Sequence, residues 1–204
     1  MPQDGAESAL DQQIDVAVAW LERNIAENSD GSAGWGWVPD VPPNPQNTAE
    51  VVCVLRQLGR TIPREAQVLM LVRSHAVAHQ TYSDWAFRAL IDVAWRLRAL
   101  RCLIEDPHDP DLRACVSALA ESQDKETGGW RLAGRNGPIS MTATSAAVLA
   151  LSGLESGPEL DIVAAVRRGT TMLVDAMVTG DERAHLAHGA AQIAMCFRSL
   201  MSRR

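Results

Sequence analysis

Aromatic side chains are scarce in this chain, which holds six Trp, two Phe and one Tyr among 204 residues. An enzyme that stabilises successive carbocations needs several aromatic faces around its cavity, and so few rings provide little for that chemistry. We therefore expect Trp35, Trp37 and Trp130 to pack on loops and helix ends rather than to line a cavity.

The four cysteines are widely separated. Cys53, Cys102, Cys115 and Cys196 lie mostly among apolar residues with helical spacing, whereas structural zinc and redox sites favour pairs spaced C-x-x-C. They are expected to be buried, reduced thiols.

Basic residues are outnumbered by acidic ones, 19 against 25, which gives a net charge of −6 and a pI near 5.3. This balance opposes a broad phosphate-binding surface, because nucleic-acid affinity comes largely from clustered Lys and Arg. The main basic run, Arg88, Arg96, Arg98 and Arg101, lies within one expected helix and is interpreted as a solvated face. The sequence therefore predicts a protein that binds no nucleic acid.

Long apolar runs are absent as well. No stretch reaches the roughly 18 apolar residues that indicate a membrane-spanning helix, and no positively charged segment followed by an apolar run opens the chain. We expect no membrane insertion and a cytoplasmic location.

The remaining pattern is helical. Apolar residues recur at spacings of three and four, and no alternating run of β-branched residues predicts a strand. With 47% apolar and 22% charged residues, the chain can bury the core of one domain. We predict an all-α protein with a flexible N-terminus at residues 1–8 and a single domain at 9–204.

Caps and breakers divide the pattern into eight expected helices. They cover about residues 9–27, 47–59, 64–80, 84–104, 111–122, 141–153, 159–178 and 181–201. Paired in order, they form about four helical hairpins, at 9–60, 61–106, 107–154 and 155–204. The uncharged helix at 141–153 should be enclosed by others, and the charged helix at 159–178 should lie outside.

Two segments repeat the same order of features. The segment Gly34–Trp37 is followed by a polar loop with prolines, then Thr48 and an apolar helix. About 95 positions later, Gly128–Trp130 is followed by a polar loop, threonines and a second apolar helix. Glycine permits a tight approach and tryptophan fills the joint, so these loops are expected to fasten neighbouring hairpins.

These segments are similar to the repeats of the squalene-hopene cyclase, oxidosqualene cyclase and protein prenyltransferase β-subunit superfamily. Gln123, Gly128 and Trp130 approximate its Q-x-x-x-G-x-W pattern with one extra residue between Gln and Gly, and Gly34–Trp37 matches it without a clear Gln. The resemblance covers about half the chain and implies an α/α toroid, with inner helices around a central cavity.

The full toroid of that superfamily uses about six hairpins, more than this chain can supply. The resemblance therefore implies a small closed toroid or an open arch. An open arch would expose apolar faces on its first or last hairpin until a homodimer or another protein completes the helical array.

Class II cyclases of this superfamily begin their reaction at an acidic D-x-D-D motif that is commonly followed by Thr-Ala. Alignment on Thr48-Ala49 puts Asn44, Gln46 and Asn47 at the positions of the three acids. An amide cannot supply the proton, so the resemblance implies a non-cyclising relative. Alternatively, Asn-Pro-Gln-Asn forms only a turn and helix N-cap.

The zinc site of the prenyltransferases has no counterpart here, because no Asp-x-Cys pair exists. His75 and His79, four residues apart on an expected helix, are the remaining candidate ligands, with Asp84 or the pair His185 and His188 as further ligands. Nothing in the sequence brings the two histidine pairs together. Such pairs are usually incidental without an HExxH glutamate, and we expect no metal and no cofactor.

The polar loops are the expected ligand-binding or partner-binding sites. The Gly134–Gly137 loop offers backbone amides to an anion, or simply covers a helix end. The candidate binding residues are Trp35, Trp37, Asn44, Asn47, Trp130, Arg131 and Arg135.

Two functions follow from these features. The first is a non-catalytic repeat scaffold that binds a partner protein or a small apolar ligand, and it predicts an open groove or an exposed apolar patch near the tryptophans. The alternative is a minimal terpenoid cyclase or prenyl-transfer enzyme acting in an apolar central cavity, with Glu50 and Asp84 as candidate acids.

Overall fold

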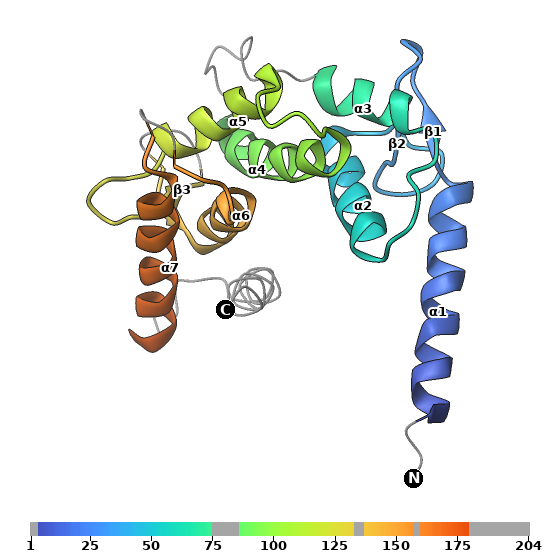
Figure 1. The fold of residues 1–204 in the computed structure, drawn as a ribbon, viewed down its shortest axis with the longest axis horizontal. Coiled ribbons are helices and arrows are strands. Elements are labelled where there is room, and N and C mark those ends of the chain that lie inside the picture. The colour runs from blue at the N-terminus through green and yellow to red at the C-terminus, as the bar shows by residue number, and fades with distance from the viewer. Residues whose placement is uncertain (1–3, 75–85, 133–136, 157–159, 180–204) are drawn as a thin grey trace. The chain divides into compact units, whose positions relative to one another are not determined.

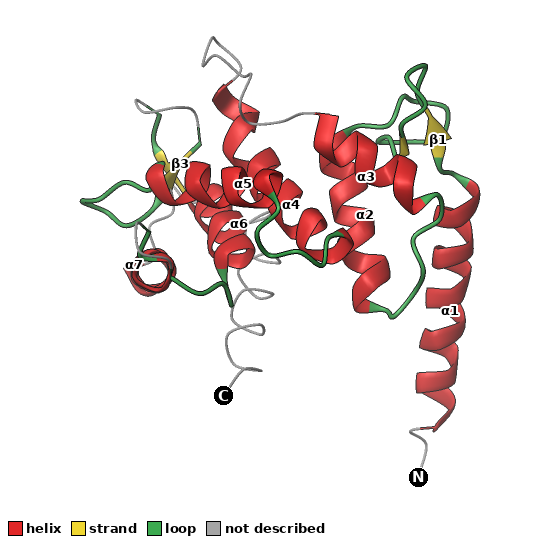
Figure 2. Ribbon diagram, turned by 45° about the horizontal axis from the view of Figure 1, so that its top comes forward, coloured by secondary structure: helices red, strands yellow, loops and turns green. Residues whose placement is uncertain are grey.

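The computed structural model describes residues 4–74, 86–132, 137–156 and 160–179. These residues form seven α-helices and two short antiparallel sheets, so the predicted all-α class is confirmed (Figure 2). Contacts divide the chain into two compact units, Met1–His75 and Ala76–Arg204, and the expected single domain at 9–204 stays a prediction. None of the described helices combines the length and the apolar composition needed to cross a membrane.

The first unit contains three helices and one sheet (Figure 1). Residues 4–8, which were expected to be part of a flexible N-terminus, are helical. Ala6 and Glu7 are good helix formers, so the helix begins five residues before its predicted start at Ala9. The elements are α1 (Asp4–Arg23), β1 (Ala26–Glu27), β2 (Ala33–Gly34), α2 (Pro45–Gln57) and α3 (Glu65–Ser74).

Helix α2 begins at Pro45, two residues before the predicted start at 47, and ends close to the predicted Gly59. Asn44 is the N-cap and its side chain accepts a hydrogen bond from the backbone N–H of Asn47 at 2.9 Å, so the interpretation of this segment as a turn and N-cap is confirmed. Gly59 ends the helix with a φ of 67°, a left-handed conformation that glycine adopts without strain.

The second unit is built around α6. Its elements are α4 (Ala86–Leu103), α5 (Pro110–Glu121), β3 (Trp130–Arg131), β4 (Ile139–Ser140), α6 (Met141–Leu151) and α7 (Ile162–Thr179). Every residue of α6 from Ala143 to Leu151 is buried, because α4, α5 and α7 all pack against it. The prediction of an enclosed sixth helix is therefore confirmed.

The sequence does not predict the two sheets. β1 pairs with β2 with Ala26 opposite Gly34, and β3 pairs with β4 with Trp130 opposite Ser140. Two residues per strand are too few to show the alternation by which strands are recognised. Each sheet lies beside a Gly-Trp segment.

In the first unit, Trp35 joins α1 to α2. Its buried indole Nε1 donates to the carbonyl of Leu21 at 2.8 Å, and its backbone N–H donates to Thr48 Oγ1 at 3.0 Å. Gly34 is required beside it, since a Cβ there would lie 2.2 Å from Thr48 Oγ1.

In the second unit, Trp130 occupies the equivalent position. Its Nε1 donates to the carbonyl of Leu119 in α5 at 2.8 Å, and its backbone N–H donates to Thr144 Oγ1 in α6 at 2.9 Å. Its ring lies against Gly169 of α7, where a Cβ would come within 2.7 Å of Cζ3. The fully buried ring thus joins three helices, and the expected partner of the indole N–H is present at Trp35 and at Trp130.

The two Trp–Thr pairs, Trp35–Thr48 and Trp130–Thr144, should contribute measurably to stability. In Thr48→Val and Thr144→Val the shape is kept but a buried N–H loses its acceptor, so we expect each change to lower the free energy of unfolding in urea by about 1–3 kcal/mol. Thr61→Val, at an exposed position, is the matched control. A loss no larger than that of the control would show that the hydroxyls do not hold these loops.

Candidate functional site

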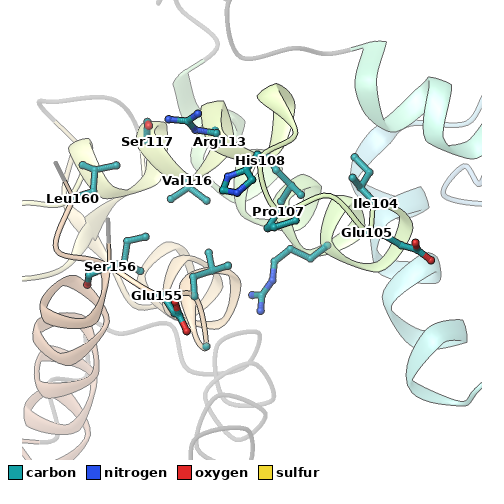
Figure 3. Close-up of a pocket in the computed structure, with 15 residues that line it drawn as sticks. Ile104, Glu105, Pro107, His108, Arg113, Val116, Ser117, Glu155, Ser156 and Leu160 are labelled. Atoms are coloured by element: carbon teal, nitrogen blue, oxygen red, sulfur yellow. The ribbon is translucent and has the colours of Figure 1, made fainter. Parts of the chain in front are cut away.

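The second unit contains an open pocket of about 880 Å³. It lies between the end of α4, the first turns of α5 and the segment that connects α6 to α7 (Figure 3). Figure 3 shows Val116 and Ser117 on α5, Pro107 and His108 on the preceding connection, and Glu155 on the segment after α6.

The inner surface of the pocket is apolar and its edge is charged. Leu112 and Ile162 are buried at 6% and 5% exposure. Further apolar lining comes from Ile104, Val116, Leu154 and Leu160. The edge carries exposed acidic and basic side chains, those of Glu105, His108, Arg113 and Glu155.

Helix caps fix one wall of the pocket. Asp109 is the N-cap of α5, and its Oδ1 accepts from the backbone N–H of Asp111 at 2.9 Å and of Leu112 at 3.3 Å. Just before it, the backbone N–H of His108 donates to Asp106 Oδ1 at 2.8 Å. These bonds hold the turn before α5 in one shape and place His108 at the pocket edge.

The opposite wall is held in a similar way. Asp161 Oδ1 accepts from the backbone N–H of Ala164 at 2.9 Å and from the hydroxyl of Ser156 at 3.2 Å. Ser156 Oγ in turn accepts from the backbone N–H of Val163 at 3.1 Å. The start of α7 is thus bonded to the segment that follows α6.

Arg101 lines the pocket but also completes the end of α6. Its Nη1 donates to the carbonyl of Ala150 at 2.7 Å and to that of Ser152 at 3.1 Å. These carbonyls have no partner within a helix that ends here, and a cation at a helix C-terminus also interacts well with its dipole. Arg101 therefore supports the inner end of the pocket.

The candidate binding residues of the first unit do not form one site. Trp35 is buried, Asn44 caps α2, and Asn47 is only 8% exposed. Glu50 is half-buried and accepts a hydrogen bond from Gln46 at 3.2 Å. Trp37 alone among them is freely exposed, at 69%.

Trp37 lies in a short exposed apolar loop together with Val38 and Val41. The loop turns back tightly, because a Cβ on Gly36 would lie 2.5 Å from the carbonyl oxygen of Val41. An exposed apolar patch near the first tryptophan segment, expected of a binding module, is therefore present at Trp37.

The candidates of the second unit lie outside the pocket. Trp130 is fully buried, and Arg131 forms an ion pair with Asp124 and donates to the carbonyl of Gly137 at 2.7 Å. Four further candidates, Arg135, Asp84, His75 and His79, lie outside the described residues. Within the part of the chain that the structure describes, no three His, Cys, Asp or Glu side chains gather as they would around a metal ion.

Gln123 connects the Trp130 loop to α7 through its side chain. Its buried Nε2 donates to the carbonyls of Gly128 and Ala165, both at 2.8 Å, and its Oε1 accepts from Arg168 at 2.7 Å. The side chain therefore binds the Trp130 loop to α7 across 42 residues of sequence.

Buried charge occurs at Arg96, which is only 5% exposed, so the interpretation of the basic run as a solvated face is wrong there. The reason is that α4 packs against both α5 and α6. Burial lowers the pKa of Arg96, and burial raises the pKa of the neighbouring Cys115 thiol to about 11, although the arginine charge opposes this rise. The Cys115 thiol is therefore buried in the core and protonated at neutral pH.

The pocket is only weakly indicated by the sequence. Glu105, His108 and Glu155 lie in two connections that the sequence predicts only as turns. The other lining residues come from separate helices and from the same connections. A signal was nevertheless present, since charged side chains in each turn adjoin apolar positions of the next helix, Leu112 and Ile162.

Comparisons of the chain with models of known families, with curated proteins and with solved structures gave no match. The resemblance to the cyclase superfamily stays a prediction.

The Asp124 ion pair should make stability depend on acid pH. The backbone N–H of Thr127 and the Arg131 guanidinium lower the pKa of Asp124 to about 2 from its ordinary value of 3.8. A depressed folded pKa gives stability that is present above the unfolded value and is lost as pH falls from about 4 to about 2. The urea midpoint of Asp124→Asn should lie below that of the unmodified protein at neutral pH, and the two should converge over this range.

Glu126→Gln, at the exposed neighbouring position, is the control and should show no such convergence. A difference between Asp124→Asn and the unmodified protein that stays constant with pH would mean that the charge of Asp124 does not stabilise the fold.

Proposed function

We propose that the protein is a non-catalytic, terpene-cyclase-like α/α repeat scaffold whose second unit binds a small apolar ligand in the pocket between α5 and the start of α7. The observation that carries the proposal is the pocket itself, with a volume of about 880 Å³ and a mainly apolar inner surface. Sites of this size and composition are typical for small molecules.

The repeat arrangement has support in the second unit. The contacts of α6 with α4, α5 and α7 fit two layers of helices, with α4 and α6 in one and α5 and α7 in the other. Gln123 and Trp130 make the loop contacts that a fastener between neighbouring hairpins requires. The proposal includes the curvature of these hairpins into an open arch or a small toroid.

The edge of the pocket suggests a ligand with an apolar body and a polar end. Arg113 and Glu155 line it from different elements and are exposed. Among the described residues neither side chain has a hydrogen bond or ion pair. Both signs of charge are therefore available to a polar group at the mouth, while Leu112 and Ile162 contact the apolar part.

A non-catalytic role is favoured by the start of α2. Asn44 caps the helix where the cyclase resemblance would put an acid, and an amide supplies no proton. The groups with shifted pKa in the described part, Arg96, Cys115 and Asp124, do not line the pocket. No specific observation favours the alternative of a terpenoid cyclase or prenyl-transfer enzyme.

A partner protein has a separate candidate surface. Trp37 and Val38, 69% and 56% exposed, present an apolar loop that a protein interface would bury. This loop belongs to the first unit and is independent of the pocket.

The pocket is tested by filling it. Dansyl-undecanoic acid should bind the full chain, and Val116→Trp should weaken that binding by about tenfold or more, roughly 1.4 kcal/mol, because the indole occupies the apolar space. Val54→Trp, at an exposed position of α2, is the control and should leave the affinity unchanged. Binding is followed by dansyl fluorescence.

Competition identifies the polar end. Dodecanol, dodecanoate and dodecylammonium share one chain and differ in charge, so their order of displacement shows which edge residues take part. The absence of dye binding, or equal binding to both Trp variants, would overturn the proposed site.

A further inference from the structure

Helix α1 presents an apolar surface that nothing in the described part of its unit covers. Leu10, Val16 and Trp20 are 57%, 65% and 45% exposed. Val18 is the only residue of α1 that is buried among those whose side chains are described. We call Leu10, Val16 and Trp20 the α1 face.

Helix α1 is attached to its unit along its other side. Trp35 bonds to Leu21 at the end of the helix, and Asp15 forms an ion pair with Arg60. These contacts leave Val16 and Trp20, four residues apart and so on neighbouring turns of one side, available to a partner.

Helix α7 presents a second apolar surface, the α7 face. In the second unit every exposed large apolar side chain of the described residues lies on this helix. The spacing of these residues puts them along one side of it, next to the side that carries the buried Leu173. They are Val163, Val174, Met177 and Val178, which are 60%, 36%, 52% and 80% exposed.

The two helices carry opposite charge. α1 contains five acidic residues and one arginine, a net charge of −4, whereas α7 contains two arginines and one aspartate, a net charge of +1. Contact between two copies of α1 would bring like charges together, and contact between α1 and α7 brings unlike charges together. Arg167 lies among the exposed positions of the α7 face and is available for such a pairing.

We propose that the α1 face of one copy of this chain packs on the α7 face of a second copy. The helices have similar lengths, about 30 Å and 27 Å at 1.5 Å per residue, so their apolar surfaces can lie along one another. In a dimer in which each copy supplies both faces, two such contacts form. The pocket plays no part in this contact.

Light scattering across a dilution series gives the first test. A dimer of twice 22.1 kDa is expected, dissociating on dilution. Trp20→Glu and Val178→Glu should each raise the dissociation constant by tenfold or more, about 1.4 kcal/mol or more by the usual conversion. Trp37→Glu, an equally drastic change at another exposed tryptophan, is the control and should have no effect. Far-ultraviolet circular dichroism confirms that the variants are folded.

Mixing two variants tests the head-to-tail pairing. Trp20→Glu retains an intact α7 face and Val178→Glu retains an intact α1 face, so one contact is restored in the mixed dimer. The mixture should associate more strongly than either variant alone. A contact of α1 with α1, or of α7 with α7, would give no such gain and would overturn the proposal.

Charge reversal tests the electrostatic part. Arg167→Glu changes the net charge of α7 from +1 to −1 and should weaken the dimer, whereas Lys125→Glu makes the same change of charge in an exposed loop and should not. Equal effects of the two variants would remove the argument from charge. A monomer at all concentrations would overturn the proposal as a whole.

Discussion

The fold of each unit depends on one small polar contact inside an apolar joint. In each joint a glycine directly precedes the tryptophan. The backbone N–H of that tryptophan would be buried without a partner if the first turn of the next helix did not present a threonine hydroxyl. Leaving such a group unpaired costs more than the hydrogen bond itself contributes. Thr48 and Thr144 therefore fix where α2 and α6 begin relative to the loops before them, and the packing of both helices follows from that position.

The sequence predicts this joint better than any other part. Tryptophan is scarce in this chain, and Trp35 and Trp130 lie in two similar segments. Each needs a tight loop and a hydrogen-bond partner for its N–H, and residues close in the sequence can supply both. The burial of α6 is also predictable, because a helix without charged residues has no side that favours contact with water. Arg96 is different: its burial follows from α5 and α6 packing on α4, and the local pattern contains no trace of that. The pocket is only weakly indicated by the sequence, because its walls come from two connections about 50 residues apart.

The residues that hold the fold and the residues available for binding are largely distinct. Trp35, Trp130 and Arg131 are occupied by internal contacts, although their types first suggested recognition. The pocket edge and the exposed apolar side chains of α1 and α7 make few internal contacts by comparison. A tryptophan is informative about function only when its surroundings are known, since the same ring serves as core at position 130 and as surface at position 37.

The position of Gly169 has a consequence for how the chain is made. The ring of Trp130 rests on this glycine of α7, and α6 has no polar side of its own. While the ribosome has released α6 but still holds α7, α4 and α5 can already pack on α6, but the ring and the side of α6 that faces α7 lack the surface that covers them in the finished protein. The second unit therefore cannot close one helix at a time during translation, and the emerging chain passes through an interval in which its most apolar helix is open to chaperones.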